Sequence, residues 1–138
     1  MTALEPIPAE LFGGGHVVHL TTLRADGSPQ SRPVWTIVDD GRVVFFTQPS
    51  SPKARDVGRD PRVALSVADR RNSYRSAWIR GRVEQVVEGE AALETIDRIS
   101  QAYIGKPFPM RSGNVYVVEP EAQGSTELPF SDADLPPR

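Results

Sequence analysis

One stretch, residues 42–69, limits what this chain can fold into more than any other, because it reads as a strand, a polar turn, a helix and a second strand. Residues 42–47 are β-branched and aromatic, which is typical of a strand. Ser51 is a good N-cap, and Pro52 suits the first helical position because an N–H group there would have no helical partner. Residues 62–69 alternate between apolar and polar side chains, as a second strand does. The helix between the strands has room for about two turns.

The start of this helix is expected to attract an anion. The first N–H groups of a helix have no helical carbonyl partner, and Lys53 and Arg55 add positive charges beside them. Nine of the 16 Lys and Arg residues lie between Lys53 and Arg82, together with three acids, in a chain of formal charge −2. A capped surface helix with solvated cations is the alternative explanation. The local concentration of positive charge favours an anionic ligand.

The rest of the chain reads as mainly β. Further runs of strand character, several of them separated by hairpin turns, are 16–23, 30–38, 76–87 and 114–119. Apolar residues at three- and four-residue intervals predict a second helix that begins at Gly89 and ends at Gly105. Six antiparallel strands and only two helices predict a small β-barrel or a strongly curled sheet.

The length of 138 residues predicts one domain with a single core. We expect an N-terminal leader at 1–15, the barrel at 16–120 and an acidic, disordered tail at 121–138. The chain has no cysteine, which excludes disulfides and thiolate metal sites. No apolar run approaches the roughly 20 residues of a membrane span, and there is no signal peptide pattern, so the cytoplasm is the default compartment.

Two strands carry residues that suit a binding surface. Pro33 cannot donate to a sheet ladder and marks an edge or an interruption, where a flat ligand could lie beside Trp35. An ordinary edge strand with a core tryptophan is the alternative. Trp78 and Arg80 share one face of the long strand 76–87, which suits a ligand wall, a subunit interface or a plain solvent-exposed face. Nucleic-acid binding is disfavoured because the cations alternate with core strand residues.

No catalytic or metal-binding constellation stands out. His16 and His19 are three residues apart on a strand, so their side chains face opposite sides and cannot form a metal pair. The sequences typical of serine hydrolases, zinc proteases and phosphate-binding loops do not occur. We therefore predict no catalytic side chain and no metal ligand.

The chain resembles the pyridoxamine 5′-phosphate oxidase superfamily over about residues 10 to 120. The segments that carry the resemblance are Arg32-Pro33-Val34-Trp35, Phe46-Thr47, Ser51 to Arg55 and Asp60 to Leu65. Within the superfamily the chain is most similar to reductases that depend on the deazaflavin F420. The resemblance implies a six-stranded antiparallel split β-barrel like those that bind FMN. It also implies a homodimer that holds the cofactor in a groove between the subunits.

The resemblance also implies which residues bind the cofactor. Lys53 matches the phosphate-binding lysine, Thr47 and Ser51 the hydroxyl donors, and the backbone from Pro33 to Thr36 would lie along the ring system. Trp78 and Arg80 would face the groove from the other subunit. The expected cofactor-binding residues are Arg32, Pro33, Val34, Trp35, Thr36, Phe46, Thr47, Ser51, Lys53, Arg55, Ser76, Trp78 and Arg80.

F420 is the expected cofactor and FMN is the alternative. FMN ends at a phosphate, whereas F420 continues into an anionic oligoglutamate chain that Arg55, Arg59 and the Arg70-Arg71-Arg75 loop could meet. Pro52 and Ser76 depart from the oxidase pattern, and its C-terminal substrate segment is missing, so oxidation of vitamin B6 is not expected.

The expected function is hydride transfer from a reduced deazaflavin to a small unsaturated acceptor, with the protein supplying orientation and exclusion of water. Two alternatives stay open. One is an FMN-binding oxidoreductase of the same fold. The other is a non-catalytic protein that binds a flavin or a tetrapyrrole.

Overall fold

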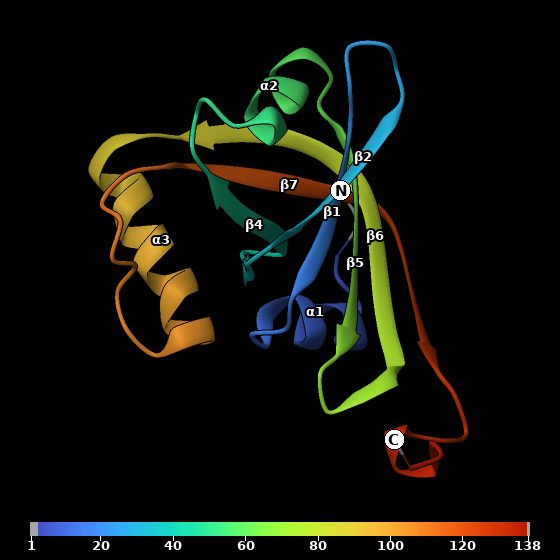
Figure 1. Cartoon of the computed structure of the whole chain (residues 1–138). Helices are drawn as coiled ribbons and strands as arrows, with labels where there is room; N and C mark the ends of the chain where they lie inside the picture. The colour runs from blue at the N-terminus through green and yellow to red at the C-terminus, as the bar shows by residue number, and fades with distance from the viewer. Residues whose placement is uncertain (1–2, 138) are drawn as a thin grey trace.

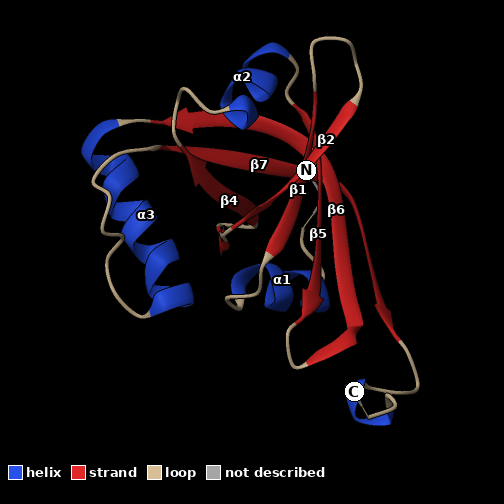
Figure 2. Cartoon of the chain, in the orientation of Figure 1, coloured by secondary structure: helices blue, strands red, loops and turns tan. Residues whose placement is uncertain are grey.

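A computed structural model describes residues 3–137 of the chain. Within these residues it contains one seven-stranded antiparallel sheet, three α-helices and a short 3₁₀ helix (Figures 1 and 2). The elements in chain order are α1 (Pro6–Gly13), β1 (Val18–Leu23), β2 (Pro29–Val34), β3 (Thr36–Asp39), β4 (Arg42–Thr47), α2 (Pro52–Arg59), β5 (Arg62–Asp69), β6 (Asn72–Val87), α3 (Gly89–Ile104), β7 (Asn114–Glu127) and the 3₁₀ helix η1 (Asp132–Asp134).

The sheet curls until its two edges approach each other. The strand order is β2-β1-β5-β6-β7-β4-β3, and every neighbouring pair is antiparallel. The edge strands β2 and β3 are joined in the chain by one residue, Trp35. Opposite edges can share such a short connection only if the sheet bends into a barrel, yet β2 and β3 are not paired with each other. This confirms the predicted mainly β, split-barrel architecture.

The predicted strand 30–38 is two strands, which raises the strand number from the expected six to seven. Pro33 has no N–H to donate, and its strand β2 pairs only with β1, so the prediction that Pro33 marks an edge is confirmed. The Thr36 N–H donates to the Tyr103 hydroxyl at 3.0 Å instead of to a strand. The ladder therefore stops at Trp35 and resumes at the opposite edge.

Both ends of the chain add more structure to the fold than the sequence predicted. The leader expected at 1–15 contains an eight-residue helix, α1, which is a third helix beside the two predicted and whose Leu11 and Phe12 are fully buried. The last strand, expected to end at residue 119, continues to Glu127 because β6 is long enough to pair with it as far as Arg75. Residues 121–127 of the predicted tail therefore belong to the sheet. Toward the C-terminus of the chain, β6 lies between β5 and β7 (Figure 1).

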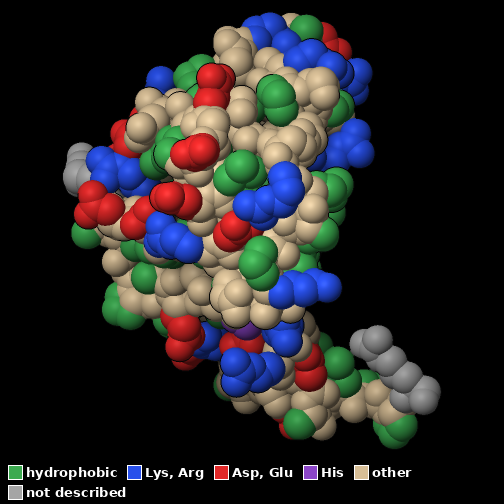
Figure 3. Space-filling model, turned by 90° about the vertical axis from the view of Figure 1, so that its left-hand side faces the viewer, with side chains coloured by type: hydrophobic (Ala, Val, Ile, Leu, Met, Phe, Trp, Pro, Cys, Tyr) green, Lys and Arg blue, Asp and Glu red, His purple; other side chains and the backbone are tan. Residues whose placement is uncertain are grey.

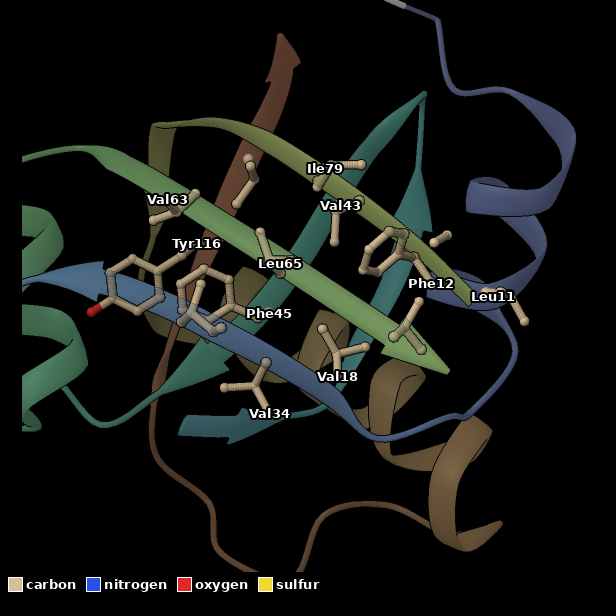
Figure 4. Packing of buried hydrophobic residues seen from close by; sticks show 14 of the residues in the cluster. Leu11, Phe12, Val18, Val34, Val43, Phe45, Val63, Leu65, Ile79 and Tyr116 are labelled. Carbon is tan, nitrogen blue, oxygen red and sulfur yellow. The ribbon is translucent and has the colours of Figure 1, made fainter. Parts of the chain in front are cut away.

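The main core fills the inside of the curl. Alternate residues of the strands point inward, and α1 covers one end with the ring of Phe12 (Figure 4). Phe45 and Tyr116 stack near the centre, with ring centroids 5.2 Å apart. The largest fully buried side chains of this core are Phe12, Phe45, Leu11, Leu20, Leu65, Ile79, Val18, Val43 and Val118.

A second apolar cluster lies outside the curl, under α3. Ile96 and Ile99 of that helix pack against Ile37 of β3 and Val44 of β4. Trp35 is partly buried against this cluster. The second core therefore fixes the position of α3 relative to the break between β2 and β3.

The sharp bend of β6 against β7 depends on Gly81. The pairing register shifts between Arg80 and Gly81, as in a β-bulge. A Cβ atom on Gly81 would lie 2.1 Å from the Glu119 carbonyl oxygen, so only glycine permits this approach of the two backbones. Among residues 3–137, no helix combines the length and the apolar composition required to cross a membrane.

Candidate cofactor site

The start of α2 is capped as the sequence predicts. Ser51 Oγ accepts a hydrogen bond from the Ala54 N–H at 3.1 Å, and Pro52 occupies the first turn. Thr47 Oγ1 donates to the same Ser51 oxygen at 2.9 Å. Both bonds use the oxygen as acceptor, so within residues 3–137 the Ser51 proton has no protein acceptor. Two hydroxyls and the first helical N–H groups thus meet at one point.

Lys53 adds a partly buried cation to this point. Burial lowers the pKa of the Lys53 amine, and the nearby charge of Arg32 lowers that pKa further. In the described part of the chain neither Lys53 nor Arg32 forms a salt bridge. Two neighbouring cations without a carboxylate create a positive potential that attracts an anion. This arrangement suits a phosphate group.

A groove of about 300 Å³ leads away from Lys53. Its lining residues are Pro33, Val34, Trp35, Phe46, Thr47, Gln48, Lys53, Phe108 and Met110. Most of the wall is aromatic or aliphatic, and the cationic and hydroxyl groups are at the α2 end. An apolar groove with a few polar groups at one end is the usual form of a small-molecule site. Its chemistry fits a flat ring system that carries a phosphate.

The aromatic wall of the groove is held in place by its neighbours. Trp35 stacks on Tyr103 with ring centroids 4.9 Å apart and lies edge to face with Phe108 at 6.0 Å. Phe46 and Phe108 are also edge to face, with centroids 5.0 Å apart. These contacts come from β4, from α3 and from the segment after α3. The position of Trp35 is therefore set by three parts of the chain.

Phe108, Met110 and Gln48 line the groove, although the sequence analysis did not single them out. Two features point to this wall. In the sequence it is the stiff Lys106-Pro107-Phe108-Pro109 connection, and in the structure it is the side chain of Met110, which is 59% exposed. Gln48 holds the segment: its Nε2 donates to the Ser112 carbonyl oxygen at 3.0 Å, and Ser112 Oγ donates to Gln48 Oε1 at 3.1 Å.

Six of the thirteen predicted residues line the groove, and Ser51 and Arg32 lie next to it. These six are Pro33, Val34, Trp35, Phe46, Thr47 and Lys53. Thr36 does not line the groove, because its hydroxyl donates to the Phe12 carbonyl oxygen at 2.6 Å and its N–H donates to Tyr103. Thr36 is fully buried and connects β3 to α1.

Arg55 lies on another side of α2. Its guanidinium donates to the Ser50 carbonyl oxygen at 2.9 Å. Together with Arg24 and Arg59 it lines a separate hollow of about 480 Å³ between α2 and the β1–β2 hairpin. Figure 3 shows Lys and Arg side chains gathered at this end of the molecule. Arg59 is partly neutralised by the buried Asp56 carboxylate, 3.1 Å away.

Ser76, Trp78 and Arg80 are not brought to the groove of their own chain. They lie on the outer face of β6, and the Arg80 guanidinium sits 5.1 Å from the centre of the Trp78 ring. Cross-strand pairing connects Trp78 to Pro33 in the groove by way of Ser66 and His19. Three strand spacings, about 14 Å, therefore separate the backbone at Trp78 from the backbone at Pro33.

The arginines of the 70–75 turn are less available to an anionic ligand than the sequence suggested. Arg75 forms salt bridges with Glu10, Asp69 and Glu127. The Arg70 guanidinium donates to the Gly15 carbonyl oxygen at 3.3 Å. Within residues 3–137 no cluster of three or more His, Cys, Asp or Glu side chains is arranged to hold a metal ion.

The comparisons with known proteins agree with this fold. The family model described as pyridoxamine 5′-phosphate oxidase matches residues 9–126. The chain therefore belongs to the pyridoxamine 5′-phosphate oxidase family, which confirms the resemblance seen in the sequence, and it has the flavin-binding fold of that family. A pyridoxine/pyridoxamine 5′-phosphate oxidase of Caulobacter vibrioides is 36% identical over 87 residues, which are 62% of this chain and 39% of that protein. The chain thus matches about two fifths of this curated relative.

Two solved structures extend the likeness over most of the chain. A protein named F420 reductase is 30% identical, with a TM-score of 0.76, over 87% of this chain and 98% of its own. A conserved hypothetical protein of Mycobacterium tuberculosis has a TM-score of 0.77 at 22% identity, over 96% and 92% of the two chains. The second likeness concerns the fold alone.

Proposed function

We propose that this protein is an oxidoreductase that transfers a hydride from reduced F420 to a small unsaturated acceptor. The observation that carries the proposal is the partly buried Lys53, which has no carboxylate partner in the described chain, at the polar end of an aromatic groove with Arg32 nearby. The names of two relatives, an F420 reductase and a pyridoxamine 5′-phosphate oxidase, support redox chemistry.

In this proposal the phosphate of the cofactor binds Lys53, the hydroxyls of Thr47 and Ser51, and the N–H groups at the start of α2. The rings of Trp35 and Phe108 cover the groove and exclude water. A reduced deazaflavin, when bound, would supply the hydride. The protein positions the two reactants, and no side chain of the groove is assigned as an acid or base.

F420 is preferred to FMN because of the hollow lined by Arg24, Arg55 and Arg59. This hollow lies on α2 next to the residues that would hold a phosphate, and its three arginines outnumber its one acid, Asp56, which suits a chain of carboxylates. FMN has no group that would reach it. The 30% identical F420 reductase supports the same choice. FMN remains the second candidate, favoured by the 36% identity to the Caulobacter oxidase.

The proposal includes a homodimer. The outer face of β5 and β6 carries the small residues Ala64 and Ser66 beside the side chain of Trp78, which is 39% exposed. A face with small side chains and an exposed apolar one suits contact with a second copy. In that dimer Trp78, Arg80 and Ser76 of one subunit would face the groove of the other. Sedimentation velocity measures the oligomeric state directly, and a monomer would contradict the proposed dimer.

The cytoplasm stays the expected compartment, on the basis of the sequence alone.

The first test is a titration of the purified protein with F420 and, separately, with FMN, followed by the fluorescence of each ligand. Lys53→Ala should weaken F420 binding by about 1.5–3 kcal/mol, the range for a charge-assisted hydrogen bond, which is about 10- to 150-fold in Kd. The only other lysine, the exposed Lys106, provides the control, and Lys106→Ala should leave Kd unchanged. An unchanged Kd in Lys53→Ala would contradict the phosphate assignment.

The titration also separates the two cofactors. Tighter binding of F420 than of FMN supports the proposal, whereas the reverse preference would favour the flavin oxidoreductase. Multiple-turnover reduction of an added quinone by reduced F420 separates an enzyme from a protein that only binds the cofactor. Binding without turnover across a panel of unsaturated acceptors would contradict the enzymatic part of the proposal.

A further inference from the structure

We infer that a second hollow, which shares Trp35 with the groove, is the acceptor site, and that Arg70 makes it select flat acceptors bearing a carboxylate. This inference rests on the proposed function, because an acceptor site has meaning only for a protein that carries out a transfer. The hollow has a volume of about 380 Å³, within the range of small-molecule sites. Its lining residues are Gly15, Val17, His19, Trp35, Ala68, Arg70 and Tyr103.

The hollow and the groove meet across one strand pair. Trp35 lines both of them. His19 of β1 lines the hollow and is the direct cross-strand partner of Pro33, which lines the groove. Partners in an antiparallel pair point to the same face of the sheet, with Cβ atoms about 5 Å apart. A ligand in the hollow would therefore lie on the same face of the sheet as a ring system in the groove, about one strand spacing away.

The walls of the hollow suit a flat, mostly apolar molecule. Val17 and Ala68 form an aliphatic floor, and the rings of Trp35 and Tyr103 form one side. Tyr103 is fixed by two hydrogen bonds, one from the Thr36 N–H at 3.0 Å and one to the His16 carbonyl oxygen at 2.5 Å. Stacking on a fixed aromatic side is favourable for a conjugated ring.

Arg70 is the full charge in this lining. Its backbone N–H donates to His16 Nδ1 at 3.1 Å, and its Nη1 donates to the Gly15 carbonyl oxygen at 3.3 Å, which holds the guanidinium at the hollow. A guanidinium has five N–H donors, so most of them remain for a ligand. The next residue, Arg71, lines a different hollow together with Glu10, Asp69 and Arg75. The two neighbouring arginines therefore serve different surfaces.

A planar fork of N–H donors recognises a carboxylate by two parallel hydrogen bonds, more strongly than it recognises a neutral oxygen. We therefore assign the hollow to conjugated or aromatic acceptors with a carboxylate. Neutral acceptors of the same shape would bind more weakly.

The test uses the full-length protein without cofactor and two probes of the same shape, 4-nitrobenzoate and 4-nitrobenzamide. Binding is followed by nitrogen-15 NMR through the indole signals of Trp35 and Trp78, which are assigned with Trp78→Phe. The anionic probe should shift the Trp35 signal and bind at least about fivefold more tightly than the amide. Arg70→Met, which keeps the aliphatic stem, should remove this preference and leave the amide affinity unchanged.

Two variants serve as controls. Arg71→Met removes the neighbouring arginine, and Lys53→Met removes the cation of the groove, and both should keep the preference for the carboxylate. An unchanged preference in Arg70→Met, or its loss in Lys53→Met, would overturn the assignment. The assignment would also be overturned if the unaltered protein bound neither probe while Arg70→Met changed the sedimentation coefficient. That pair of results would mean that a second copy of the chain fills the hollow.

The same measurements keep this inference separate from the proposed function. Titration of F420 tests the groove, and the probe tests the hollow without any cofactor. The probe should still bind when F420 is present. Competition between the two ligands would place the probe in the groove and overturn the acceptor site.

Discussion

The ring of Tyr103 lies parallel to the indole of Trp35, with 4.9 Å between the ring centroids and 8° between their planes. The Tyr103 hydroxyl accepts the Thr36 N–H at 3.0 Å and donates to the His16 carbonyl oxygen at 2.5 Å. Burial raises the pKa of Tyr103, so the hydroxyl keeps its proton at neutral pH. One side chain of α3 thus fixes both the break between β2 and β3 and the chain entering β1.

Tyr103→Phe should destabilise the protein by about 1–3 kcal/mol, because the Thr36 N–H would lose its partner. Urea unfolding measures the change. Tyr74→Phe is the matched control, since the Tyr74 ring packs edge to face on Phe130 and its hydroxyl forms no hydrogen bond within residues 3–137. Equal stabilities of the two variants would contradict the assigned role of the Tyr103 hydroxyl.

Gly15→Ala should be more harmful than Gly27→Ala, although both glycines have a positive φ, 76° and 85°. An added Cβ on Gly27 would have nothing within 4 Å, so Gly27→Ala should cost only the backbone strain of about 1–2 kcal/mol. On Gly15 the Cβ would lie 2.5 Å from the Ala102 carbonyl oxygen and would separate the 13–15 turn from α3. Urea unfolding compares the two variants, and a similar loss in both would show that this contact adds nothing.

Stability should fall on mild acidification because of His16. The ring is 4% exposed, and burial lowers the His16 pKa below its ordinary value of 6.5, while Asp69 and Glu10 oppose this effect and Arg70 and Arg71 reinforce it. Below pH 6.5 the unfolded chain therefore binds a proton that the folded protein does not, so the free energy of unfolding decreases as the pH falls through this value.

His16→Asn offers the test of this pH dependence. The asparagine amide oxygen is able to accept the Arg70 N–H, which now donates to His16 Nδ1 at 3.1 Å, but it does not titrate. Urea unfolding between about pH 5 and 8, the range around an ordinary histidine pKa, should show a flatter profile for the variant than for the natural protein. Parallel profiles would contradict the assignment to His16.

Thr22→Val should destabilise the fold by about 1.5–3 kcal/mol, the range for a hydrogen bond to a charged group. Thr22 Oγ1 donates to Asp56 Oδ2 at 2.7 Å, and the Asp56 residue is only 5% exposed. This bond attaches α2 to β1. Thr21→Val is the control on the same strand, because the Thr21 side chain forms no hydrogen bond in the described chain. A calorimetric unfolding temperature that drops equally in both variants would argue against the bond.

The local signals in the sequence were sufficient to predict the strand, helix and strand unit around α2. Ser51 caps the helix and Pro52 lies in its first turn because these preferences depend on a few neighbouring residues. The helix predicted from Gly89 to Gly105 is also present, as α3 with Gly105 at its C-cap. Such elements depend on contacts between residues close in the chain.

Other features depended on partners that are distant in the chain. The break at Trp35 follows from Tyr103, which takes up the Thr36 N–H from 67 residues away. The helix α1 is stable because Leu11 and Phe12 enter a core built by the strands. Periodicity within a short window carries no information about such partners.

The candidate site also combines features that the local sequence predicted with features that only the tertiary structure produced. The residue types around Lys53 and Thr47 predicted an anion site at the start of α2, and the structure places both in one groove. Phe108 and Met110 joined the groove only through the folding of the segment after α3. Arg55 points away from the groove because its guanidinium donates to the Ser50 carbonyl oxygen. The number of charged residues in the sequence does not reveal this orientation.

The sequence by itself determined the mainly β class, the capped helix α2 and the family resemblance, because each of these rests on residues that are close together in the chain. The tertiary structure alone decided that the sheet edges meet at Trp35, and that Arg70 and Arg71 serve different hollows. The physical reason is that burial and long-range hydrogen bonds, not local propensity, decide where the ladder breaks and which way each side chain faces.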